Sequence, residues 1–194
     1  ASSFFVGDAQ KGVPGLVVSA LLQQNPMMIY FGQEYGERGM EKEGFSGNDG
    51  RTTIFDYWSV DTIVRAAQRK LTTQEKQLKT IYDKVISIAT NEKAIVSGAC
   101  FDLMYVNGQY NHEYAFIRKA GAEVLLVVAN FADSDQTVGI TIPGHAFDFL
   151  NLKEKNVSAT DLLSEGKQKL SLKRDEAVAI NVQGNNAVVL KFKA

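Results

Sequence analysis

Residues 26–36 read Pro-Met-Met-Ile-Tyr-Phe-Gly-Gln-Glu-Tyr-Gly. The apolar run at residues 27–31 is short and opens into a loop bracketed by glycines. A run of this length predicts a strand buried on both faces, as in parallel sheets. The loop carries Gln33, Glu34 and Tyr35, which are polar groups able to bind a hydroxyl-rich ligand. The segment therefore predicts a strand that ends at a binding loop.

Helical patterns surround this predicted strand. An apolar face repeats with the spacing of a helix before it and twice after it. Residues that favour helix N-termini precede the later two patterns, and the residue before Pro26 ends the first. We expect helices over residues 15–24, over residues 62–70 with Asp61 as the cap, and from Thr72 or Thr73 to about residue 90.

The second half of the chain changes to short strands with turn-prone separators such as Asn107-Gly108 and Pro143-Gly144. Strands at such spacing predict an antiparallel β-sandwich. The predicted strands cover residues 99–106, 114–119, 123–131, 136–142, 167–172, 177–182 and 187–193.

The two patterns predict an α+β chain with a boundary near residue 95. Residues 1–94 hold one buried strand among helices, and residues 95–194 hold the sandwich. One buried strand cannot form a stable parallel sheet alone, because such strands need neighbours on both edges. We therefore expect residues 1–94 to be the end of a larger domain.

Composition excludes several classes of protein. The chain has 194 residues, 45% of them hydrophobic, and a formal net charge of −1, which argues against a nucleic-acid partner. The longest apolar runs, residues 13–22 and 124–129, are too short to span a membrane. Cys100 is the single cysteine, and the acidic residues near Gly50 lack the spacing of a calcium loop. We predict no metal and no cofactor.

Residues 25–36 resemble the eighth-strand segment of the α-amylase superfamily, glycoside hydrolase family 13. The loop with Gly47-Asn-Asp-Gly-Arg51 and residues 53–58 is similar to the version found in amylase-like enzymes of the Bacteroides type. The long helix and the sandwich resemble that family's eighth barrel helix and C-terminal β-domain. The resemblance implies that residues 1–94 are the remnant of a (β/α)8 TIM barrel, about its eighth strand with flanking helices.

The resemblance also implies a chemistry. Retaining enzymes of this kind use two carboxylates about 5–5.5 Å apart. In this family those carboxylates come from the fourth and fifth barrel strands, and a third aspartate follows the seventh strand in an Asn-His-Asp triplet. Residues 1–12 resemble sequence just downstream of that triplet, so we assign no catalytic residue in this chain and expect the chain alone to be inactive.

The resemblance implies partners and a location as well. The parent would act on α-glucan or maltooligosaccharide, and the rest of the barrel would be a partner of this chain. A bacterial periplasmic or extracellular location is favoured over a cytoplasmic one.

Candidate substrate-binding residues lie in the loop and just after it. Glu34 is either an acid at the active-site face or, as we favour, a structural carboxylate that accepts hydrogen bonds beneath the pocket. The aromatic residues Tyr57 and Trp58 would stack on a sugar ring or pack in the core. An arginine and an aspartate nearby would bind hydroxyls or close the loop as an ion pair. The candidates are Gln33, Glu34, Tyr35, Arg51, Asp56 and Trp58.

A second function is open for the sandwich, which could be a non-catalytic scaffold or a glycan-binding module. Binding modules carry exposed aromatic residues on one face. Tyr105, Tyr110 and Tyr114 fall at alternating apolar positions that predict the core. The scaffold role is therefore favoured over glycan binding.

Overall fold

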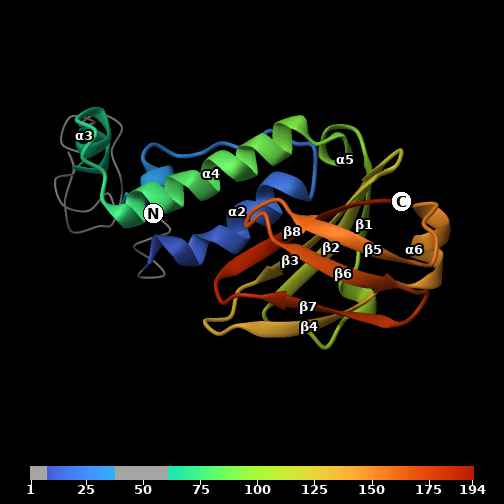
Figure 1. Cartoon of the computed structure of the whole chain (residues 1–194). Coiled ribbons are helices and arrows are strands. Elements are labelled where there is room, and N and C mark those ends of the chain that lie inside the picture. Colours follow the sequence, from blue (N-terminus) through green and yellow to red (C-terminus); the bar gives the residue numbers. More distant parts are fainter. Residues whose placement is uncertain (1–7, 38–60) are drawn as a thin grey trace. The chain divides into compact units, whose positions relative to one another are not determined.

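The computed structural model describes residues 8–37 and 61–194 (Figure 1). Contacts within the chain divide it into two compact units, residues 1–13 with 26–83 and residues 14–25 with 84–194. Helix α4 (Thr73–Asn91) contributes residues to both units. This division does not test a domain boundary between residues 94 and 95, which stays a prediction.

Helix α4 begins where its sequence predicts. The side-chain hydroxyl of Thr72 accepts a hydrogen bond from the Glu75 backbone N–H at 3.2 Å, and the Glu75 carboxylate accepts one from the Thr72 N–H at 2.7 Å. This reciprocal pair is a capping box, which satisfies N–H groups that have no partner inside the helix. The other described elements of the first unit are η1 (Ala9–Gly12), η2 (Gln33–Tyr35) and α3 (Asp61–Ala67).

The predicted strand at residues 27–31 is wrong. Residues 26–30 have no regular secondary structure, and the Met28 side chain is 84% exposed. A strand needs neighbouring strands to pair its N–H and C=O groups. Among residues 8–37 and 61–194, every strand belongs to the second unit, so the run finds no partner.

The second unit contains the antiparallel strands that the sequence predicts. A six-stranded sheet has the order β1-β2-β3-β8-β5-β6, and β4 pairs with β7 (Figure 1). Every pair is antiparallel. The bounds are β1 (Ala99–Asp102), β2 (Glu113–Ala120), β3 (Glu123–Asn130), β4 (Gln136–Thr141), β5 (Lys155–Asp161), β6 (Lys167–Leu172), β7 (Ala177–Val182) and β8 (Asn186–Lys193).

Both sheets contribute to one hydrophobic core. Leu126 of β3 and Leu190 of β8 lie in the same buried cluster as Ile140 of β4 and Ile180 of β7. Among the described strands, β1 and β6 are the edges of the larger sheet, and each pairs with one strand. The unit also contains most of α2 (Val13–Leu21), α5 (Lys93–Val96), η4 (Met104–Val106) and α6 (Gly144–Phe149).

Arg118 of β2 joins helix ends to the larger sheet. Its side chain is almost fully buried, and it donates hydrogen bonds to four backbone carbonyls. Three of these belong to α5 or the turn after it, and the fourth follows α2. Carbonyls at helix C-termini lack partners inside the helix and attract positive charge. One guanidinium therefore caps the ends of two helices.

Gly98 allows this approach. A Cβ at Gly98 would lie 2.2 Å from the Ala94 carbonyl oxygen and 2.6 Å from the Lys119 carbonyl oxygen. Glycine is the residue that lets two backbones come this close. The turn between α5 and β1 therefore depends on the missing side chain.

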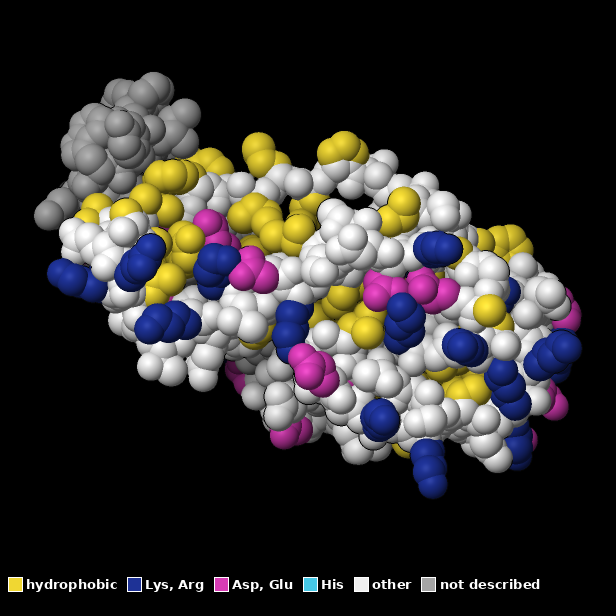
Figure 2. All heavy atoms as spheres, turned by 45° about the horizontal axis from the view of Figure 1, so that its top comes forward, with side chains coloured by type: hydrophobic (Ala, Val, Ile, Leu, Met, Phe, Trp, Pro, Cys, Tyr) yellow, Lys and Arg dark blue, Asp and Glu magenta, His cyan; other side chains and the backbone are white. Residues whose placement is uncertain are grey.

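The surface is mixed in charge on the face that Figure 2 shows, where acidic and basic side chains are interspersed. Within the described residues, no helix combines the length and the apolar character that crossing a membrane requires.

Candidate functional site

The loop after residue 31 folds into a tight turn between two glycines. Gly32 and Gly36 flank η2 with φ values of 78° and 77°. This left-handed region is strained for residues that carry a Cβ. A Cβ at Gly36 would also lie only 2.8 Å from the Ala9 Cβ. The glycine brackets thus fix the position of Gln33, Glu34 and Tyr35.

Gln33 links this turn to α4. Its side-chain carbonyl accepts the Tyr30 N–H at 3.1 Å, and its amide donates to the Tyr82 hydroxyl at 3.0 Å. Burial, partly offset by this bond from Gln33, raises the pKa of Tyr82. Both ends of the Gln33 side chain are therefore used to hold the loop.

Glu37 ties the same loop to α3. Its carboxylate accepts hydrogen bonds from the backbone N–H of Thr62 at 3.2 Å and from the Thr62 hydroxyl at 2.5 Å. The N–H groups in the first turn of a helix have no partner inside the helix, and a carboxylate is favourable there. Glu37 thus positions the start of α3 beside the loop.

Glu75 connects α3 to α4 with a second carboxylate. The Arg65 guanidinium donates to Glu75 Oε1 at 2.5 Å through Nη2 and at 3.0 Å through Nε, beside the bond from the Thr72 N–H. Burial alone would raise the pKa of Glu75, but the hydrogen bonds from Arg65 and Thr72 outweigh it and lower that pKa. Glu75 is therefore a charged structural anchor.

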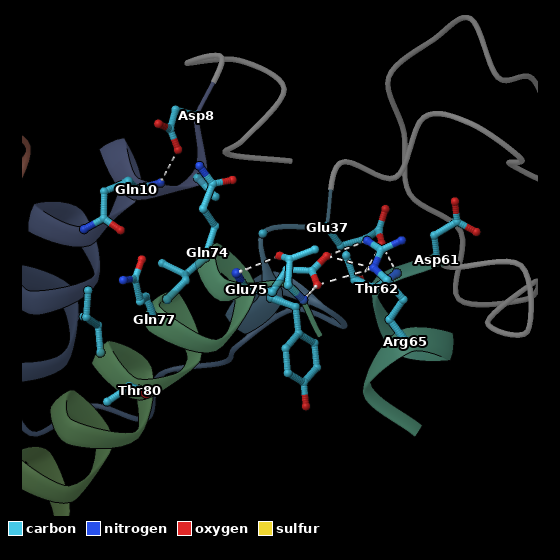
Figure 3. A pocket seen from close by; sticks show the side chains of 16 residues that line it. Asp8, Gln10, Glu37, Asp61, Thr62, Arg65, Gln74, Glu75, Gln77 and Thr80 are labelled. Carbon is cyan, nitrogen blue, oxygen red and sulfur yellow. Dashed lines mark hydrogen bonds and ion pairs between the residues drawn. The ribbon is translucent and has the colours of Figure 1, made fainter. Parts of the chain in front are cut away.

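These contacts surround a cleft of about 1050 Å³ in the first unit. Figure 3 shows Gln10, Gln74 and Gln77 around it together with the Arg65–Glu75 pair. Within the described residues, the side-chain amides of these three glutamines have no hydrogen-bond partner. An amide offers both donors and an acceptor. These amides can therefore exchange hydrogen bonds with the hydroxyl groups of a ligand.

The structure describes three of the six predicted site residues. Tyr35 lines the cleft. Glu34 is half-buried, and within the described part of the chain it makes no hydrogen bond. Its structural role stays a prediction. Ligand contact by Gln33, Glu34 and Tyr35 stays a prediction. Arg51, Asp56 and Trp58 lie outside the described residues.

Sequence reasoning missed Gln10, Gln74 and Gln77. They come from η1 and α4, and each looks like an ordinary exposed glutamine in the sequence. No local pattern could have singled them out, since only the fold brings them to one cleft.

The cleft contains no free catalytic pair among the carboxylates that hold it together. Glu37 and Glu75 both accept hydrogen bonds from helix N-termini, and Glu75 also holds Arg65. Among the residues that the structure describes, no group of three or more His, Cys, Asp or Glu side chains lies where it could hold a metal ion.

Comparison of sequences finds no match, since no family model and no curated protein matches the chain. Comparison of structures, in contrast, finds matches among solved structures. A maltogenic α-amylase AmyB from Thermotoga neapolitana matches 95% of this chain with a TM-score of 0.62 and 13% identity. AmyP in complex with maltose matches 94% with a TM-score of 0.60 and 16% identity. An α-amylase from Geobacillus thermoleovorans complexed with acarbose matches 95% with a TM-score of 0.55 and 13% identity.

These matches cover almost all of this chain but only 33–37% of the other chains. The chain therefore has a fold that occurs within α-amylase structures, and it spans about a third of their length. The resemblance to the α-amylase superfamily that the sequence indicates is confirmed at the level of fold.

Proposed function

We propose that this chain is the C-terminal part of an α-amylase-like glycoside hydrolase that acts on α-glucosidic bonds of starch-like glucans. The observation that carries the proposal is the structural match to α-amylases over about 95% of the chain. AmyP, one of the matching structures, holds maltose, which supports the proposed substrate class. A periplasmic or extracellular location in a bacterium belongs to the same proposal.

In this proposal the reaction proceeds with retention of configuration. Such a reaction needs one carboxylate as nucleophile and a second as acid and base. Glu37 and Glu75 are engaged as structural anchors, so neither is assigned these roles. The catalytic carboxylates would come from the rest of the barrel, and this chain would supply part of the sugar-binding rim and the sandwich.

The glutamine amides of the cleft support a role in binding. The amides of Gln10, Gln74 and Gln77 can exchange hydrogen bonds with sugar hydroxyls, which are themselves both donors and acceptors. The glycine-bracketed turn and the two carboxylate anchors hold the walls of the cleft in place. A site held by such supporting contacts loses little entropy when a ligand binds.

The test compares the parent protein that contains this chain with the 194-residue chain alone. Maltoheptaose is the substrate, and proton NMR follows both the release of products and their anomeric configuration. We expect turnover with retention by the parent, and none by the isolated chain. Cellohexaose, which has β-linkages, is the matched control and should not be cleaved.

Each part of the proposal can fail separately. A parent that leaves maltoheptaose intact refutes the α-glucan assignment. Inversion of configuration refutes the retaining mechanism. Robust turnover by the isolated chain refutes the placement of the catalytic carboxylates elsewhere.

A further inference from the structure

An aromatic cluster lies at the surface of the second unit. Phe101 has the ring of Phe149 at 5.9 Å, that of His145 at 5.3 Å and that of Tyr105 at 6.2 Å, measured between centroids. Tyr105 is 59% exposed and Phe149 is 63% exposed. We call these four residues the aromatic platform. Its rings are tilted by 44–58°, so they do not cover one another as a parallel stack would.

The exposure of Tyr105 contradicts the sequence pattern. Tyr105 sits at a position that predicts the core, but the strand β1 ends at Asp102 and η4 turns the tyrosine outward. Exposed aromatic side chains that gather at one place mark binding surfaces. The platform is therefore a candidate site in the half of the chain that looked like a scaffold.

Hydrogen bonds hold the backbone of η4 at both of its ends. The Asp102 carboxylate accepts the Met104 N–H at 2.8 Å. Asn107 is fully buried, and its amide donates to the carbonyls of Leu103 at 2.8 Å and Thr141 at 3.1 Å. A turn pinned in this way presents its side chain in one orientation. The tyrosine therefore pays little entropy on binding.

Helix α6, which carries His145 and Phe149, is also fixed. The Asp175 carboxylate accepts the Gly144 N–H at 2.9 Å, and Arg174 donates to Asp148 at 2.6 Å and to the Gly144 carbonyl at 2.9 Å. The same guanidinium lies over the Phe147 ring at 5.4 Å. Phe149 thus projects from a helix that its neighbours hold rigidly.

The platform combines apolar rings with groups that bind hydroxyls. The Tyr105 hydroxyl and the His145 ring nitrogen Nε2 form a hydrogen bond with each other, and both side chains are exposed. Asp148 lies next to Phe149 in the chain and is also exposed. A pyranose ring has C–H bonds on its faces and hydroxyls around its rim. The C–H groups suit the electron-rich face of an aromatic ring, and the hydroxyls suit the polar groups beside it.

We propose that the aromatic platform of the second unit binds a glucose unit of an α-glucan chain. The choice of an α-glucan rests on the proposed function and on the maltose held by a matching structure.

A protein partner and an anionic polymer fit the aromatic platform less well than a sugar does. Two exposed rings offer far less than the roughly 800 Å² that each partner buries in a stable protein interface. Arg174, the cation beside the platform, is paired with Asp148, which disfavours an anionic polymer.

Calorimetric titration of the 194-residue chain with maltoheptaose tests the proposal. Phe149→Ala and Tyr105→Ala should each weaken binding at least about tenfold, which corresponds to about 1.4 kcal/mol. Phe149→Leu keeps an apolar side chain but removes the ring, and it should weaken binding as much as alanine does. Phe131→Ala is the matched control, because this phenylalanine is 44% exposed and lies outside the platform. Circular dichroism checks that each variant is folded.

The outcomes separate this proposal from the proposed function. Maltoheptaose binding that survives Phe149→Ala but is lost in Gln77→Ala overturns the platform and leaves the proposed function standing. Absence of any binding by the folded chain also overturns the platform, while turnover by the parent decides the proposed function independently. Platform-dependent binding of cellohexaose instead of maltoheptaose overturns the α-glucan assignment.

Discussion

Replacing Arg118 with methionine should destabilise the second unit strongly. The guanidinium donates hydrogen bonds at 2.9 Å to Leu22, 3.1 Å to Ala94, 2.7 Å to Ile95 and 3.0 Å to Gly98, all at carbonyl oxygens. Methionine fills much of the same volume but donates none of these bonds. Carbonyls at two helix ends would then lose their partner in the interior.

The expected loss follows from two opposing contributions. Hydrogen bonds from a charged group are worth about 1.5 kcal/mol each at the low end, so four give about 6 kcal/mol. Methionine also removes the cost of burying the guanidinium, which offsets several kcal/mol of that sum. We expect a net loss of about 3 kcal/mol in the free energy of unfolding. For a chain of this length that lowers Tm by roughly 6–12 °C.

Guanidinium denaturation followed by far-UV circular dichroism measures this loss. Lys119→Met is the matched control, since it removes a positive charge from the next residue of the same strand, where the side chain is only half-buried. The free energy of unfolding of this control should stay within about 0.5 kcal/mol of that of the unsubstituted chain. Arg118→Lys should fall between the two, because one ammonium group cannot reach four carbonyls. A loss below about 1 kcal/mol for Arg118→Met would refute the role as a cap of two helices.

Three further predictions concern Gly98, Glu75 and Tyr110. Gly98→Ala should cost at least about 2 kcal/mol in a denaturant titration, since its Cβ would meet backbone oxygens at 2.2 and 2.6 Å, whereas Gly108→Ala, with nothing within 4 Å, should be nearly neutral. The lowered pKa of Glu75 means that the charged carboxylate stabilises the first unit above the ordinary carboxyl range, and that this stability is lost as the pH falls through the folded pKa. The free energy of unfolding should therefore fall more steeply with decreasing pH in the unsubstituted chain than in Glu75→Gln. Equal slopes in the two proteins would contradict the anchor role. Burial raises the pKa of Tyr110 from 10.0 to about 12, so its contribution is complete below pH 10 and is lost between pH 10 and 12. Tyr110→Phe should remove that alkaline loss of stability, and an unchanged pH profile would show that the hydroxyl does not titrate as inferred.

Local chemistry explains which elements could be predicted from the sequence. The start of α4 follows from Thr72 and Glu75 alone, because a capping box lies within four residues. The strands β6 and β7 have the predicted bounds, since their buried and exposed residues alternate. Strand β5 was missed because its inward positions include small or polar residues such as Ala159 and Asp161. It pairs with β6, the next strand along the chain, and with β8.

The candidate site was less predictable for a different reason. Gln33, Glu34 and Tyr35 stood out because glycines bracket them, and the structure does hold them in a tight turn. Gln10 of the cleft lies in η1, whereas Gln74 and Gln77 lie in α4, more than sixty residues further along the chain. No spacing in the sequence connects them. Tyr105 of the aromatic platform is exposed although the sequence predicts it in the core, since η4 ends the alternation on which that prediction depends.

The free edge of the larger sheet has a consequence for solubility at high concentration. Among the strands that the structure describes, β6 pairs with β5 alone, and the N–H and C=O groups on its other side could accept a strand from another molecule. Lys167 and Lys169 are exposed on that strand. A second copy that docked there would bring four ammonium groups together and remove water from them. Two lysines on one short strand therefore protect the chain against growth into fibres.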